Sequence, residues 1–128
     1  MGHRVLIVDD HASIRSRLGS RFEAQGFEVR DAANGAEGVE TAKAYHPEVI
    51  ILDLSMPVMN GLEAARTLRE LMPGIPLLLF TNTVEPIVEQ EAFSAGIVSV
   101  FSKSDSADLV VEDAKARLAD QMGESRRD

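Results

Sequence analysis

The stretch Val5-Leu6-Ile7-Val8-Asp9-Asp10 decides the fold, because a short apolar run leads directly into two carboxylates. Three further apolar runs end in the same way: residues 49–52 at Asp53, residues 77–80 at Thr81 and residues 98–102 at Lys103. Short apolar runs separated by stretches of helix length are typical of buried strands in a parallel sheet. Ligands of such sheets bind outside the carboxyl ends of the strands, so we expect these polar residues to converge on one site.

Helix patterns fill the stretches between the apolar runs. Ile14, Leu18 and Phe22 recur every four residues and predict a first helix, and a second, shorter strand is expected over Glu28–Ala32. The remaining helices are marked by Asn34-Gly35, the stretch 62–68, Pro86 and the cluster Ser104-Asp105-Ser106. Strict alternation with right-handed crossovers predicts an α/β fold, in which five helices cover both faces of a doubly wound, five-stranded parallel sheet.

The length and composition predict one soluble domain. The chain has 128 residues and no internal repeat, and its longest apolar run is too short to cross a bilayer. No signal-peptide pattern opens the chain, so we expect a cytoplasmic protein without membrane insertion. Cysteine is absent, which excludes disulfides, thiolate catalysis and sulfur-ligated metals. Residues 1–122 are expected to form the domain, followed by a frayed polar tail over residues 123–128.

The charge distribution argues against a nucleic-acid partner. The formal net charge is -8 at pH 7, whereas nucleic-acid binders carry a basic stripe. The densest basic group consists of Arg15, Arg17 and Arg21, which fall within the first helix pattern. We interpret these arginines as a solvated helix face and expect no direct contact with nucleic acid.

The predicted site carries excess negative charge. Asp9, Asp10 and Asp53 together with Lys103 leave a formal charge of -2, which a divalent cation would cancel. Oxygen-only ligands suit Mg²⁺ or Mn²⁺ and not zinc. With the cation and the lysine neutralising charge, Asp53 can act as a nucleophile toward a phosphoryl group, and Thr81 can donate a hydrogen bond to it.

These residues resemble bacterial response regulator receiver domains, the phosphoacceptor part of two-component signalling. Residues 53–61 are similar to the phosphoacceptor loop of that family, and the acidic pair, the hydroxyl and the lysine follow its order and spacing. The resemblance covers nearly the whole chain and implies a flavodoxin-like fold. The stretch 61–65 is also similar to receivers of LuxR-class regulators.

The resemblance implies a role for each site residue. It makes Asp53 the phosphorylated residue, Asp10 a direct metal ligand and Asp9 a metal-site acid acting through water. The backbone carbonyl of Ser55 would be a further ligand, and Thr81 and Lys103 would hold the phosphoryl oxygens. The implied partners are a sensor histidine kinase or phosphotransfer protein and a downstream protein or detached output domain. Such a chain is a signalling phosphoacceptor, not an enzyme: it undergoes only Mg²⁺-dependent self-phosphorylation and autodephosphorylation.

Three positions depart from the family pattern. Val100 stands where the family usually has an aromatic switch residue, and Phe101 is expected to point to the opposite face, into the core. Asn82 replaces the small residue that usually follows the hydroxyl. Ser104 stands where many receivers have a cis proline, and we expect a trans bond there, because a cis bond without proline costs about 2.5–4 kcal/mol.

Two other functions are compatible with parts of the pattern. A metal-dependent phosphohydrolase of the haloacid-dehalogenase type would need a second acid two residues after Asp53, where this chain has Ser55. A pseudo-receiver, which keeps the fold without being phosphorylated, would explain Val100 and Asn82. His11 lies beside the acidic pair, but an oxygen-ligated site does not require imidazole, so we interpret His11 as solvated.

Overall fold

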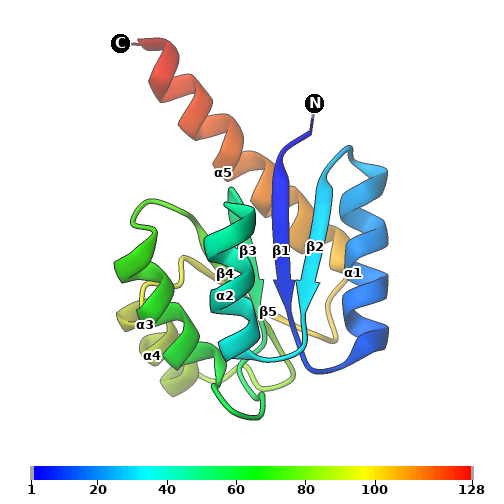
Figure 1. The fold of residues 1–128 in the computed structure, drawn as a ribbon, viewed down its shortest axis with the longest axis vertical. Coiled ribbons are helices and arrows are strands. Elements are labelled where there is room, and N and C mark those ends of the chain that lie inside the picture. Colours follow the sequence, from blue (N-terminus) through cyan, green and yellow to red (C-terminus); the bar gives the residue numbers. More distant parts are fainter. Residues whose placement is uncertain (1, 128) are drawn as a thin grey trace.

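The computed structural model describes residues 2–127, with side chains described for residues 2–120. Within this range, strands and helices alternate as the sequence predicts (Figure 1). The strands are β1 (Arg4–Val8), β2 (Glu28–Ala32), β3 (Val49–Leu52), β4 (Leu77–Thr81) and β5 (Ser99–Ser102). The helices are α1 (Ala12–Ala24), α2 (Gly35–Tyr45), α3 (Gly61–Leu71), α4 (Pro86–Ser94) and α5 (Ala107–Arg127).

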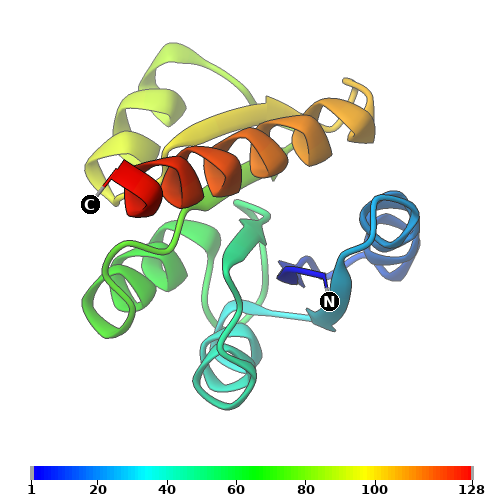
Figure 2. The same ribbon diagram turned by 90° about the horizontal axis from the view of Figure 1, so that it is seen from above.

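The five strands form one parallel sheet in the order β2-β1-β3-β4-β5. Figure 2 shows α1 and α5 on one side of this sheet and α2 and α3 on the other. The predicted doubly wound architecture is therefore confirmed. Because all strands run the same way, their carboxyl ends lie at one edge of the sheet, which is the lower edge in Figure 1.

Alternating strand residues build a separate core on each face of the sheet. Leu6 and Val8 pack with α2, α3 and α4, whereas Val5 and Ile7 pack with α1 and α5. Every residue of β3 and β4 is buried, as expected for strands that helices cover on both faces. This two-sided burial makes the central strands a rigid support for the residues that follow them.

Short polar residues set the helix starts near the carboxyl edge. The Asn34 side chain accepts a hydrogen bond from the Glu37 amide at 2.9 Å and caps α2. Asn60 caps α3 through the amides of Leu62 and Glu63, both at 3.0 Å. Pro86 occupies the first turn of α4, where its missing N–H costs nothing.

Helix α5 extends over most of the segment that was predicted to form a polar tail. Helix α5 continues to Arg127, whereas a frayed tail was predicted from Gly123 to Asp128; Asp128 itself lies outside the described residues. The boundary between residues 122 and 123 thus has no counterpart in the secondary structure. No described helix is both long and apolar enough to cross a membrane.

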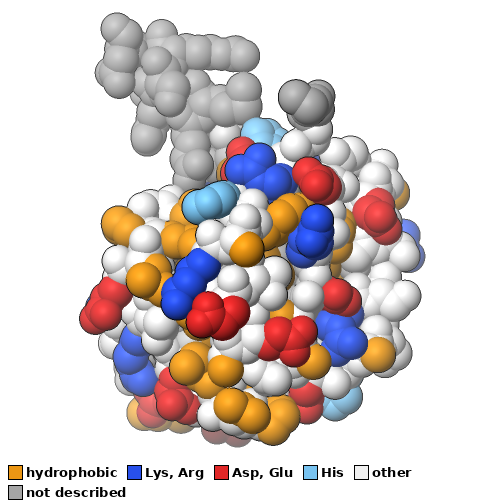
Figure 3. Space-filling model, in the orientation of Figure 1, with side chains coloured by type: hydrophobic (Ala, Val, Ile, Leu, Met, Phe, Trp, Pro, Cys, Tyr) orange, Lys and Arg blue, Asp and Glu red, His pale blue; other side chains and the backbone are white. Residues whose placement is uncertain are grey.

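The visible surface mixes charges of both signs. Figure 3 shows acidic and basic side chains interspersed over the face seen in Figure 1, with apolar side chains gathered at its lower edge. One exposed apolar residue of the loop after β3 is Val58, whose side chain is 83% exposed. Its φ of 70° is unfavourable for a β-branched residue, so this loop holds Val58 in a strained conformation.

Candidate functional site

Backbone hydrogen bonds carry the sheet one residue beyond the strand ends and so position the site. The Asp53 amide donates to the Val8 carbonyl at 2.9 Å, and the Lys103 amide donates to the Thr81 carbonyl at 2.8 Å. The Asp9 amide donates to the Ala32 carbonyl at 3.1 Å. The site residues are therefore held by the ladder itself and not by flexible loops.

The side chains of Asp9, Asp53 and Lys103 meet at the carboxyl edge. The Lys103 ammonium forms ion pairs with Asp9 Oδ2 at 2.7 Å and with Asp53 Oδ2 at 3.3 Å. Lys103 follows the edge strand β5, so its long side chain crosses the end of β4 to reach residues that follow β3 and β1. Thr81 ends β4 and is also buried. The predicted convergence of Asp9, Asp53 and Lys103 is confirmed, while the chemical roles of these residues and of Thr81 stay predictions.

The surroundings of Asp53 disfavour its negative charge. Burial raises the pKa of Asp53 to about 6, and the neighbouring Asp9 carboxylate acts in the same direction, while Lys103 opposes both. At neutral pH the carboxylate is ionised and can act as a nucleophile. In mildly acidic solution it becomes protonated, and its capacity for nucleophilic attack falls.

The loop after Asp53 closes tightly against the chain that it leaves. The Gly61 amide donates to the Leu54 carbonyl at 2.9 Å, and a Cβ atom at Gly61 would lie only 2.1 Å from the Asp53 carbonyl oxygen. Any larger residue at this position would displace the Asp53 backbone. Met56 and Met59 of this loop pack against the core. The motif over residues 53–61 thus positions the backbone of Asp53.

A hollow lies beside the acids on the side of this loop. Its volume is about 430 Å³, and its lining includes Asp10, Ser55 and Asn60. Asp10 is more accessible than the other acids: its side chain is 32% exposed, against 3% for Asp9. An exposed carboxylate beside an open hollow is accessible to a ligand from solvent.

His11 is closer to the acids than its interpretation as a solvated residue implies. Its Nδ1 atom lies 3.1 Å from Asp9 Oδ1 and 3.1 Å from Asp10 Oδ1. The His11 amide also donates to Asp9 Oδ1 at 2.9 Å. The prediction of exposure is correct, since the side chain is 55% exposed, but the contacts with both carboxylates were missed.

Arg15 is less exposed than predicted for a solvated helix face. Arg17 and Arg21 are exposed, as predicted for a solvated helix face, but the Arg15 side chain is only 20% exposed. Its Nη1 donates to the Asp9 carbonyl at 2.8 Å, and its Nε donates to Asp31 Oδ2 at 3.0 Å. A useful signal was present, because Arg15 lies one helical turn after His11 and so faces back toward the acidic loop.

The donor set fits a hard divalent cation. Asp9, Asp10, His11 and Asp53 each offer a ligand atom, and these atoms lie within 4.8 Å of one another. The three carboxylates supply the oxygen ligands that Mg²⁺ and Mn²⁺ prefer, and the hollow beside Asp10 leaves room for water ligands. Ser55 lines the same hollow, which is consistent with its predicted place in the ligand set.

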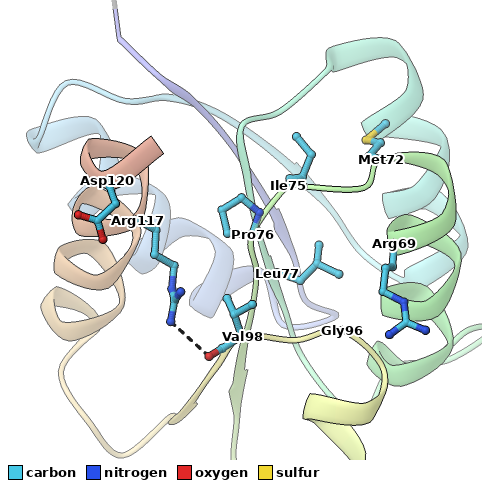
Figure 4. A pocket seen from close by; sticks show the side chains of 10 residues that line it. Arg69, Met72, Ile75, Pro76, Leu77, Gly96, Val98, Arg117 and Asp120 are labelled. Carbon is cyan, nitrogen blue, oxygen red and sulfur yellow. Dashed lines mark hydrogen bonds between the residues drawn. The ribbon is translucent and has the colours of Figure 1, made fainter. Parts of the chain in front are cut away.

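A second cavity lies at the opposite end of the sheet. It measures about 390 Å³, and Figure 4 shows Arg69 and Arg117 on opposite sides of an apolar floor that includes Ile75 and Pro76. Arg69 donates to the Ser94 carbonyl at 3.2 Å. Arg117 donates to the Val98 carbonyl at 3.2 Å and forms an ion pair with Asp113 at 2.9 Å. Both guanidinium groups are therefore already engaged within the protein.

The positions that depart from the receiver pattern lie as predicted. Val100 packs with the α4 side of the sheet and Phe101 with the α5 side, although Phe101 is half-buried and not fully in the core. No described peptide bond is cis, so the bond before Ser104 is trans. Asn82 is exposed directly after Thr81.

Comparison with known proteins identifies the family. A model of the response regulator receiver domain matches residues 5–115, so the chain belongs to this family. It is 34% identical to the chemotaxis protein CheY of Thermotoga maritima over 113 residues, which are 88% of this chain and 94% of that protein. It is 44% identical over 109 residues, or 80% of this chain, to a protein-glutamate methylesterase/protein-glutamine glutaminase of Methanosarcina acetivorans.

The solved structures agree with this assignment. A DNA-binding response regulator of the LuxR family from Staphylococcus aureus superimposes with a TM-score of 0.83 and 26% identity, covering 90% of this chain and 98% of that one. The chain spans only about 30% of the length of the Methanosarcina methylesterase, so the match is to the receiver part of that protein. Phosphorylation-dependent switching is typical of receiver domains, which generally bind Mg²⁺ and are typically not enzymes.

Proposed function

We propose that Asp53 accepts a phosphoryl group in a Mg²⁺-dependent reaction and that the modified chain switches a partner-binding surface. The observation that carries this proposal is the pairing of the buried Asp53 with Lys103, whose ammonium lies 3.3 Å from Asp53 Oδ2. A buried carboxylate with a cationic neighbour and an open acidic hollow is suited to phosphoryl transfer. That reaction depends mainly on positioning and charge neutralisation.

The chemistry follows from the geometry. A carboxylate oxygen of Asp53 forms a bond to phosphorus while the bond from phosphorus to the donor's leaving group breaks. Lys103 and the Thr81 hydroxyl then hold phosphoryl oxygens, which places a positive charge and a hydrogen-bond donor where negative charge develops. Lys103 would have to give up its 2.7 Å contact with Asp9 at least in part, so the two carboxylates and the phosphoryl group compete for one ammonium.

Asp10 and Asp53, with the Ser55 backbone carbonyl, are the proposed ligands of Mg²⁺ or Mn²⁺, and Asp9 would act through water. When bound, the cation would neutralise charge on the carboxylates and on the phosphoryl oxygens. The exposure of Asp10 supports its place as a direct ligand, because it is the acid most accessible from the hollow.

The proposed phosphodonor is a sensor histidine kinase or a phosphotransfer protein, since receiver domains interact with these and with output domains. Receiver domains are typically cytoplasmic, and we propose the same location here. The proposed readout surface is α4 and its flanks, where Ile87 and Phe93 are 57% and 51% exposed. The partner would be a downstream protein or a detached output domain, and we propose no direct contact of this chain with nucleic acid.

Intact mass spectrometry tests the phosphoacceptor role. The chain would be incubated with acetyl phosphate and Mg²⁺, alongside Asp53→Ala and the control Asp120→Ala, which removes an exposed carboxylate of α5. Native and control chains are expected to gain one phosphoryl group, and Asp53→Ala none. If Asp53→Ala also gains a phosphoryl group, the phosphorylated residue is not Asp53.

The same experiment separates the alternatives. If no chain gains mass with acetyl phosphate or with a phosphorylated kinase, the pseudo-receiver remains and the phosphoacceptor function is rejected. That alternative is not favoured, because the acids, the hydroxyl and the lysine all occupy the strand ends. The phosphohydrolase alternative is disfavoured by the family assignment and by Ser55 in place of a second acid.

A further inference from the structure

The acidic loop between β1 and α1 is held at two points by one residue of α1. The guanidinium of Arg15 donates to the Asp9 carbonyl at 2.8 Å, and the Arg15 amide donates to the His11 carbonyl at 3.1 Å. These two carbonyls flank Asp10 along the chain. The backbone on both sides of Asp10 is thus tied to Arg15.

Arg15 is itself anchored to the neighbouring strand. Its Nε donates to Asp31 Oδ2 at 3.0 Å, and Asp31 lies on β2 opposite Ile7 of β1. The guanidinium therefore bridges the edge strand and the peptide group that joins Asp9 to Asp10. With 20% of its side chain exposed, Arg15 is more enclosed than a solvated surface arginine.

We propose that Arg15 is a positioning residue for the divalent-cation site. By fixing the Asp9–Asp10 peptide group, it sets the direction of the Asp10 carboxylate, which side-chain contacts with His11 alone would hold loosely. The inference rests on the proposed function, because it takes Asp10 as a cation ligand. Residues that orient metal ligands typically change metal affinity by about 10- to 100-fold when they are removed.

The sign of the effect separates positioning from simple charge. Arg15 is a cation near an acidic cluster, so on charge alone its removal would strengthen the binding of another cation. Loss of positioning would weaken that binding instead. A variant that loses the positive charge and still binds Mg²⁺ less tightly cannot be explained by electrostatics alone.

Calorimetric titration with MgCl₂ measures this directly for the native chain, Arg15→Met, Arg15→Lys and Arg17→Met. We expect about 10-fold weaker Mg²⁺ binding for Arg15→Met and a smaller loss of affinity for Arg15→Lys. Lysine keeps the positive charge, but its ammonium cannot reproduce the planar guanidinium that donates to both the Asp9 carbonyl and Asp31. Arg17→Met removes the same charge from an exposed position of α1 and should bind Mg²⁺ as the native chain does, or slightly more tightly.

A second readout separates positioning from general damage to the fold. In the acetyl phosphate reaction, Arg15→Met should need about 10-fold more Mg²⁺ for half-maximal phosphorylation, yet reach the native extent at saturating Mg²⁺. Loss of extent at saturation, together with a lower melting temperature, would indicate a structural role and overturn the proposal. If Arg15→Met does not fold, Arg15→Lys carries the test.

The outcomes also separate this inference from the proposed function. If the native chain binds Mg²⁺ and Arg15→Met binds it equally or more tightly, the positioning role of Arg15 is overturned. The proposed phosphoacceptor function of Asp53 is then unaffected. Absence of Mg²⁺ binding by the native chain overturns both.

Discussion

At Asp53, the features that suit phosphoryl transfer also oppose folding. Asp53 is 4% exposed and lies beside Asp9, and its pKa rises from the ordinary value to about 6 in the folded chain. The folded state then holds its proton more tightly than the unfolded state does. The stability of the metal-free chain should therefore fall as the pH rises from about 4 through 6, and stay reduced above that range.

Asp53→Asn is expected to remove this cost. One pKa unit corresponds to about 1.4 kcal/mol, so in EDTA at pH 7.5 the variant should gain about 3 kcal/mol in free energy of unfolding. At pH 4, where Asp53 is largely neutral, the gain should nearly vanish. Urea unfolding at both pH values measures it, with Asp120→Asn as an exposed control. An equal gain at both pH values would contradict the electrostatic explanation.

At the scale of elements, the start of α3 supports the loop that follows Asp53. Asn60 accepts hydrogen bonds from the amides of Leu62 and Glu63, and the Glu63 side chain returns a contact to the Asn60 amide at 3.4 Å. This capping box begins α3 at Gly61, whose backbone lies against Asp53. The cap therefore contributes to the placement of the phosphoacceptor loop as well as to helix stability.

Asn60→Ala is expected to lower the free energy of unfolding by about 1 kcal/mol, because two helix amides lose their partner. Asn82→Ala removes an exposed amide that caps no helix and should change stability by less than about 0.5 kcal/mol. Chemical denaturation followed by circular dichroism compares the two variants. Equal effects would show that the Asn60 cap adds nothing to stability.

At the scale of the whole molecule, the C-terminal helix α5 contacts elements from distant parts of the sequence. Its buried residues pack against α1 and the sheet, and Leu118 is the last of them among the described side chains, at 3% exposure. Arg117 donates to the Ser99 hydroxyl at 2.7 Å and so ties α5 to β5. The helix continues beyond these contacts to Arg127 and projects from the body of the domain (Figure 1).

A chain ending at residue 122 is expected to keep the fold, with a melting temperature within a few degrees of the full chain. The contacts of Arg117 and Leu118 are preserved, so the domain boundary predicted from the sequence remains testable in this way. A chain ending at residue 116 loses both residues and should be destabilised by at least about 2 kcal/mol, the usual cost of deleting a buried leucine side chain. Thermal unfolding separates the two chains, and similar melting temperatures would show that the end of α5 is dispensable.

Local patterns were sufficient to predict the fold class and the convergence of Asp9, Asp53 and Lys103 at the carboxyl edge. The alternation of apolar runs with helix patterns depends on neighbouring residues only. Most site residues are marked by their place at a strand end: Asp53 follows β3, Lys103 follows β5 and Thr81 ends β4. The sequence did not indicate how far α5 extends, because polar composition alone does not stop a helix: α5 runs through Gly123 to Arg127, and fraying of this end stays a prediction.

The sequence by itself determined the order of the elements, the polar residues at the strand ends and the family to which the chain belongs. Only the tertiary structure decided how those residues share the site: Asp9 is buried against Lys103, while Asp10 faces solvent beside His11. Likewise, only the folded chain places Arg15 between β2 and the acidic loop. The physical reason is that burial and pairing depend on which strands become neighbours. That choice is made by long-range packing and leaves no mark on any local stretch of sequence.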